Sequence, residues 1–155
     1  MNEALFSAAS LVAIGAWCVL VIAAFRPAGK ARARLLYLGG RIAPLGLCAL
    51  YAAVIVLRAP SPPGSGFSSL AAFMTGQTAP GNALTGWLHF LAFDLWVGRW
   101  VVDDTLRGRA PRLALVLSLP ATLMYGPLGL LLHLTLGRLL ASALPKNQGP
   151  PVGSP

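Results

Sequence analysis

Three ionisable side chains stand inside one apolar stretch of the chain. His89, Asp94 and Arg99 all lie within residues 85–104, which otherwise hold mainly leucine, valine, phenylalanine and tryptophan. A histidine and a carboxylate can both donate and accept protons, so His89 and Asp94 are candidates for acid/base catalysis. An ionisable group at the centre of a membrane helix costs roughly 2.5–3.5 kcal/mol and marks a functional site by default. The stretch therefore predicts a polar site that is held between helices.

The composition indicates that lipid surrounds most of the chain. Of the 155 residues, 56% are hydrophobic and 10% are charged, whereas a soluble domain has about 25% charged residues. The net charge is +8, but the basic residues fall mostly between apolar segments, where they set orientation and meet anionic lipids. Cys18 and Cys48 lie in separate apolar segments without metal-ligand spacing. We therefore expect an integral membrane protein with membrane lipids as partners and with no nucleic acid.

Four apolar segments have the length of roughly 20 residues that a bilayer requires. They predict an all-α fold, an integral membrane four-helix bundle. A single transmembrane domain is expected over residues 1–144, followed by a disordered C-terminal tail over residues 145–155. The predicted spans are residues 4–25, 35–57, 84–102 and 113–138.

The loops between these segments predict an orientation. Basic residues gather in the first and third loops, which the positive-inside rule places in the cytoplasm, with the N- and C-termini on the non-cytoplasmic side. The loop of residues 59–83 has an apolar centre at Leu70–Met74 and is expected at the outer interface. The first span is not preceded by the basic region of a signal peptide or by a transit segment. A retained span in a bacterial inner membrane is therefore expected.

Helical periodicity separates the polar side chains of the third span. At 100° per residue, Asp94 lies about 140° from His89. Arg99 is five residues beyond Asp94 and can instead reach Asp103 at i+4. Arg41, in the second span, lies at a similar depth to Asp94. We therefore predict an Arg41–Asp94 pair between helices, which serves either the site or the helix register.

Other polar and aromatic side chains complete the expected site. His133 falls toward the outer end of its span, like His89, so two histidines could ligate haem. Two ligands make an incomplete metal site, and we expect neither a metal nor a cofactor. Tyr125 is a candidate to place its hydroxyl in the same cavity. Trp96 is a candidate to line a long apolar ligand, as is Trp87, unless Trp87 belongs to the interfacial aromatic belt.

The longest motif of the chain resembles that of a known family. Residues 86–99, Gly-Trp-Leu-His-Phe-Leu-Ala-Phe-Asp-Leu-Trp-Val-Gly-Arg, followed by Asp103-Asp104, resemble the signature span of the abscisic-acid-deficient-4-like membrane proteins. Gly126-Pro127-Leu-Gly129 followed by His133 is similar to the final span of that family, and Arg26-Pro27-x-x-Lys30 is similar to the end of its first span. The resemblance covers about residues 4–140.

The resemblance implies a carotenoid-related isomerase activity. In plants the family includes neoxanthin synthase, which is associated with converting the epoxycarotenoid violaxanthin to the allenic neoxanthin. That reaction needs a group that donates a proton to the epoxide oxygen and a base for a carbon-bound proton. The family positions carried over are His89, Asp94, Arg99 and His133, with Asp94 and His89 as the acid/base pair and Arg99 as an orienting group. A bacterial chain is expected to act on another carotenoid or isoprenoid lipid.

The residues leave other functions open. A non-catalytic carotenoid- or lipid-binding membrane protein would use the aromatic side chains alone. A small transporter or proton-relay subunit would use the intramembrane Asp94 and His89 to move protons or ions. A haem-binding redox protein would use His89 and His133 as axial ligands. A homo-oligomer is compatible with each of these functions.

Overall fold

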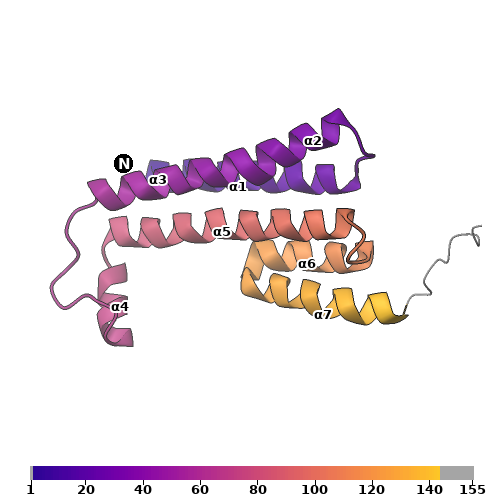
Figure 1. Ribbon diagram of the computed structural model, residues 1–155. Coiled ribbons are helices and arrows are strands. Elements are labelled where there is room, and N and C mark those ends of the chain that lie inside the picture. Colours follow the sequence, from indigo (N-terminus) through magenta and orange to yellow (C-terminus); the bar gives the residue numbers. More distant parts are fainter. Residues whose placement is uncertain (1, 144–155) are drawn as a thin grey trace, which may run out of the picture.

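The computed structural model describes residues 2–143, which form helices and connecting segments with no strand among them. The all-α fold class is therefore confirmed. Figure 1 shows three layers: α1 and α3 in the first, α5 in the second, and α6 with α7 in the third. The helices are α1 (Asn2–Phe25), α2 (Lys30–Tyr37), α3 (Ala43–Leu57), α4 (Leu70–Gln77), α5 (Pro80–Leu106), α6 (Arg112–Tyr125) and α7 (Pro127–Ala143), with a π-helical turn, η1 (Leu38–Ile42), between α2 and α3.

Two of the described helices are long and apolar enough to cross a membrane. They are α1 and the continuous helix Lys30–Leu57, which joins α2, η1 and α3. Within η1 the backbone widens, and the N–H of Ala43 donates to the carbonyl of Leu38, five residues earlier. A Cβ on Gly39 would lie 2.9 Å from the carbonyl oxygen of Ala16. The absence of a side chain at this turn therefore lets the second helix approach α1 closely.

The central helix is α5, which contacts both of the outer layers. At 27 residues it is about 40 Å long, which exceeds the hydrocarbon core of a bilayer in length, but it is not one of the two helices that are also apolar enough to cross one. The indole of Trp17 on α1 covers Gly98 of α5, where any Cβ would overlap the ring. Small residues permit such close helix contacts. The buried residues of α5 recur mainly at every third or fourth position, so they share one side of the helix. They are Leu84, Leu88, Ala92, Leu95, Gly98, Val101, Val102 and Thr105.

The segment predicted as a single span over residues 113–138 forms two helices, and the expected four-helix bundle is not confirmed. Gly126 ends α6 with a φ of 45°, and Pro127 begins α7, which runs back along α6 (Figure 1). Gly129 lies so close to Thr122 that a Cβ there would overlap it. The 14 residues of α6 extend about 21 Å, less than the roughly 30 Å hydrocarbon core of a bilayer.

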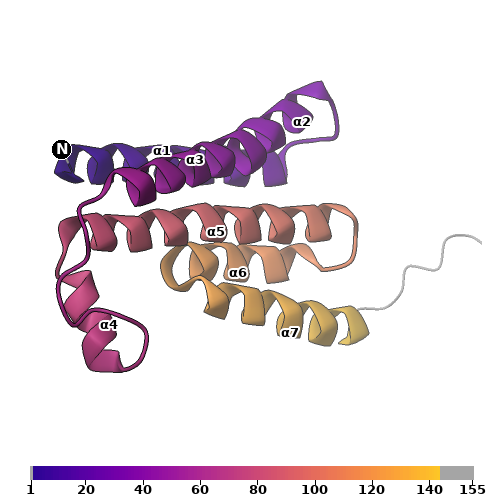
Figure 2. The ribbon, with the colours of Figure 1, turned by 60° about the vertical axis from the view of Figure 1, so that its left-hand side comes forward.

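This hairpin also decides where the last described helix ends. In both ribbon views α7 finishes beside the connection between α5 and α6, at the opposite end of the molecule from the start of α1 (Figure 2). The described helices therefore give no support to the prediction that both termini lie on the non-cytoplasmic side. The tail predicted over residues 145–155 lies outside the described residues.

The expected interfacial segment forms a short helix, α4. The Ser69 hydroxyl accepts a hydrogen bond from the Ala72 N–H at 3.1 Å, which caps the N-terminus of α4. The helix lies beside the start of α5 and runs across its direction (Figure 2). Leu70, Phe73 and Met74 are exposed on it. The apolar centre of the loop thus presents its side chains outward.

Candidate functional site

Asp94 lies against the turn between α6 and α7. A Cβ placed on Gly126 would meet Oδ1 of Asp94 at 2.6 Å, so the half-buried carboxylate packs directly on the backbone of this turn. The predicted pair with Arg41 is not formed. Arg41 is exposed on η1, and no ion pair joins it to Asp94 within residues 2–143.

His89 occupies an aromatic surface on another side of α5. Its exposed ring stacks on Phe93 with the centroids 4.6 Å apart, and Tyr51 of α3 lies at 6.1 Å. No hydrogen bond or ion pair between His89 and Asp94 is described in residues 2–143. The two candidate acid/base groups therefore share a helix but not a direct contact.

Arg99 links α5 to the second helix. Its Nε donates to Oδ2 of Asp103 at 2.8 Å, so the predicted i+4 contact is confirmed. Its Nη1 donates to the carbonyl oxygen of Leu36, just before the π-turn. Its side-chain carbons pass over Gly40, where a Cβ would lie 2.5 Å from Cδ. Arg99 therefore connects α5 to the helix Lys30–Leu57.

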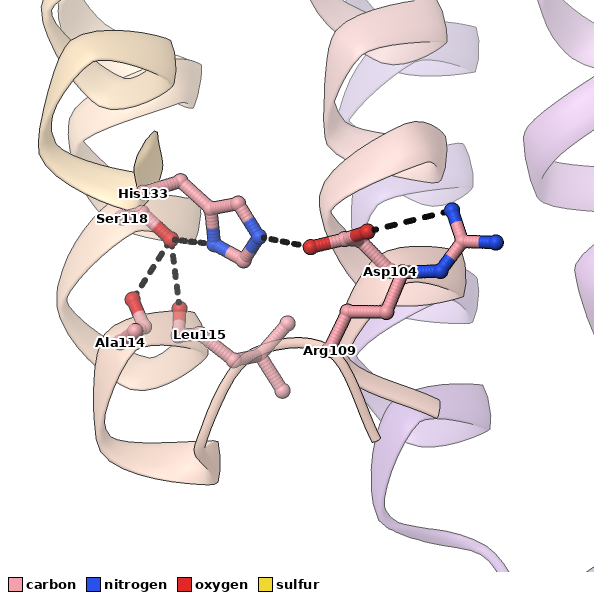
Figure 3. Close-up of polar contacts among 6 residues, drawn as sticks. All are labelled: Asp104, Arg109, Ala114, Leu115, Ser118 and His133. Carbon is pink, nitrogen blue, oxygen red and sulfur yellow. Dashed lines mark hydrogen bonds and ion pairs between the residues drawn. The ribbon is translucent and has the colours of Figure 1, made fainter. Parts of the chain in front are cut away.

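His133 is the centre of a buried polar chain across three helices (Figure 3). Its Nε2 lies 3.2 Å from Oδ2 of Asp104 on α5, and its Nδ1 lies 3.3 Å from the hydroxyl of Ser118 on α6. The edge of its ring meets Trp100, with the centroids 5.5 Å apart. The side chain is 1% exposed. Sequence reasoning selected His133 but missed Ser118, for which the chain carries no local signal.

Ser118 connects the backbone of α6 to the ring of His133. Its hydroxyl donates to the carbonyl oxygen of Ala114 at 2.6 Å, and the same oxygen atom lies within hydrogen-bond distance of Nδ1 of His133. Ser118 is fully buried, so the chain joins α5, α6 and α7 rather than presenting a nucleophile.

Three other predicted site residues lie on the outer surface. Trp96 is 54% exposed and Tyr125 is 67% exposed, so neither lines an interior cavity. Trp87 donates from Nε1 to the Ser10 hydroxyl at 2.9 Å and stacks on Phe6, which fastens the start of α5 to α1. The aromatic side chains of α5 are therefore distributed around the helix.

A groove that sequence reasoning missed runs between α1 and α6. Its volume is ≈ 590 Å³, and none of the predicted site residues lines it. Trp17 and Leu119 are buried at its base, while most of its other side chains are exposed. A groove of this size and polarity suits a long apolar molecule. The lining consists of Ile14, Trp17, Cys18, Val21, Ile22, Phe25, Val116, Leu119, Pro120 and Leu123.

These features define an all-helical protein with two potential membrane helices, polar residues on a central helix and an apolar groove on its flank. Within residues 2–143, no group of three or more His, Cys, Asp or Glu side chains could hold a metal ion. A family model described as ABA DEFICIENT 4-like matches residues 4–133, and the chain belongs to this family. The resemblance seen in the sequence is thereby confirmed. No curated protein and no solved structure matches the chain.

Because Asp94 packs on Gly126, we expect any side chain at position 126 to destabilise the fold. Gly126→Ala is expected to lower the free energy of unfolding by about 2 kcal/mol, from the left-handed backbone and from overpacking. Unfolding in mixed detergent micelles measures the loss. Gly46→Ala is the matched control, because Gly46 is helical and has open space around its Cα. In a protein that already carries Asp94→Ala, the Gly126→Ala substitution should cost less, because the overpacking against the carboxylate is gone. If Gly126→Ala lowered the free energy of unfolding equally with and without Asp94, the contact would be contradicted.

Proposed function

We propose that this protein is a membrane-embedded protein that binds and modifies a carotenoid or another isoprenoid lipid. Membership of the ABA DEFICIENT 4-like family supports a relation to neoxanthin synthase. The observation that carries the proposal is the apolar groove of ≈ 590 Å³ between α1 and α6, which has the character that a polyene chain requires. The two potential membrane helices support a location in the bilayer.

Asp94 is the group we propose for acid/base chemistry on the bound lipid. Leu123 lines the groove on α6 and precedes Gly126, whose backbone packs on the Asp94 carboxylate. An isoprenoid in the groove extends its end group past Leu123 toward this turn. Isomerisation of an epoxide adds one proton to the ring oxygen and removes one from carbon, so the reaction consumes no co-reactant. His89 is the second candidate for this proton exchange, and Arg99 holds α5 in position.

One observation favours a second function, a non-catalytic carotenoid- or lipid-binding protein. The side chains that line the groove are apolar apart from the thiol of Cys18, and neither Asp94 nor His89 is among them. A protein that only stores or shields a polyene needs no polar group beside it. In that case the ionisable residues of α5 serve the packing of the helices.

Filling the groove is expected to weaken retention of the pigment. Leu123→Trp places an indole in the groove, and overpacking of roughly 1–3 kcal/mol corresponds to about a tenfold loss of bound carotenoid. The protein is expressed in a carotenoid-producing host, and the pigment that copurifies is measured by its absorption spectrum and by chromatography of the lipid extract. Leu131→Trp is the matched control, because Leu131 is exposed on α7 outside the groove.

The same extracts distinguish the two functions. A pigment profile that changes on expression supports the modifying protein, whereas copurified pigment with an unchanged profile supports the binding protein. If Leu123→Trp and Leu131→Trp retained the same amount of carotenoid, the groove would not be the binding site. If no host yielded bound or altered pigment, both functions would be contradicted.

A further inference from the structure

A second, polar pocket lies between the end of α5, the connection from α5 to α6, and α7, at the end of the molecule opposite the N-terminus of α1. Its volume is ≈ 150 Å³. It is separate from the apolar groove and shares no lining residue with it. The lining consists of Asp104, Arg109, Ala110, His133, Leu134, Gly137 and Arg138.

The charged side chains that line this pocket offer more hydrogen-bond donors than acceptors. Asp104 already accepts from His133 through Oδ2, and its Oδ1 lies 3.9 Å from Nη1 of Arg109 (Figure 3). Arg109 is 65% exposed, so this long ion pair occupies only part of its guanidinium. Arg138 is exposed at the same pocket, and no hydrogen bond or ion pair is described for it within residues 2–143. Two guanidinium groups and one carboxylate therefore line the pocket, and each oxygen of the carboxylate already has a partner.

We propose that this pocket binds a phosphate group, which an anionic lipid headgroup or free phosphate can supply. Guanidinium groups present planar pairs of N–H donors that match phosphate oxygens. The bond to Nε2 of His133 occupies Oδ2 of the Asp104 carboxylate, which also lines the pocket. Arg107 and Arg112 flank the pocket in the chain and add positive potential. The positive-inside rule places this end at the cytoplasmic leaflet, where anionic headgroups are enriched.

The test compares two arginines at the same end of the molecule. The full chain in detergent is titrated with phosphatidylglycerol and, separately, with phosphatidylcholine, and bound lipid is counted by native mass spectrometry. Arg138→Gln is expected to weaken phosphatidylglycerol binding about tenfold, the equivalent of one charged hydrogen bond. Arg34→Gln is the matched control, since Arg34 is exposed on α2 outside the pocket. It should change the binding less than twofold, an expected surface-charge effect of roughly 0–0.4 kcal/mol.

Each arm has a defined result. Displacement of phosphatidylglycerol by inorganic phosphate supports the pocket with free phosphate as a ligand, and resistance to displacement with loss in Arg138→Gln supports the lipid headgroup. Equal weakening by Arg138→Gln and Arg34→Gln would overturn the proposal, as would equal binding of both lipids. Circular dichroism of the variants checks folding, and Arg138→Lys should restore part of the binding. The outcome is independent of what the apolar groove binds.

Discussion

Asp94→Asn is expected to abolish conversion of the carotenoid, with turnover falling about 100-fold or more, because a general acid or base contributes roughly 10²–10⁴. Asparagine has the shape of aspartate, so the contact with Gly126 is kept while the proton exchange is lost. The pigment profile of a carotenoid-producing host, normalised to the amount of protein, measures the effect. Pigment bound in the groove should remain, which separates loss of chemistry from loss of the fold.

Asp103→Asn is the matched control for this experiment. It is the same substitution on the same helix, and it weakens only the ion pair with Arg99. Conversion at the wild-type rate in Asp94→Asn would exclude Asp94 as an acid or base. His89→Ala forms a separate arm, because the two groups lie on different sides of α5. A normal profile in that variant would leave Asp94 as the one remaining candidate of the pair.

The second large effect concerns stability. His133→Ala is expected to lower the free energy of unfolding by about 3 kcal/mol, because it removes a fully buried ring and the partner that the partly buried Asp104 carboxylate shares with the Ser118 hydroxyl. The imidazole also fills space against Trp100, which adds to the loss. Unfolding of the purified protein in mixed micelles, followed by circular dichroism, measures the change.

The chain supplies its own control, since the sequence has 2 histidines in contrasting surroundings. His89 is exposed and makes ring contacts only, so His89→Ala should cost less than about 1.5 kcal/mol. A double-mutant cycle with Asp104→Ala gives the coupling energy between His133 and Asp104. Additive losses in that cycle would show that the described hydrogen bond contributes nothing to stability.

Hydropathy and spacing predicted the parts of the fold that depend on local pattern. The first two spans, residues 4–25 and 35–57, correspond to long apolar helices. The contact between Arg99 and Asp103 follows from i,i+4 spacing. The fourth span failed because hydropathy averages over a turn: residues 113–138 are mostly apolar on both sides of Gly126, and the sharp reversal there leaves that average unchanged.

The candidate site was harder to predict, because its contacts join distant parts of the chain. The partners of His133 come from α5 and α6 and meet it only when the hairpin folds back. Arg41 was paired with Asp94 because the two residues lie at similar depths along their spans, and depth does not fix the direction in which a side chain points. In the structure Arg41 lies in the π-turn Leu38–Ile42 and is exposed. The groove depends on the arrangement of α1 and α6 around α5, which no local pattern encodes.

The shortness of α6 has a consequence for the surrounding bilayer. In the membrane location proposed above, α1 matches the full hydrocarbon thickness, whereas α6 is shorter than it by about 9 Å. Acyl chains beside Gly126 would then tilt or compress, and the protein would act on the bilayer as a wedge. Lipids with shorter tails relieve this mismatch, so thin or strongly curved membranes should accommodate the protein best.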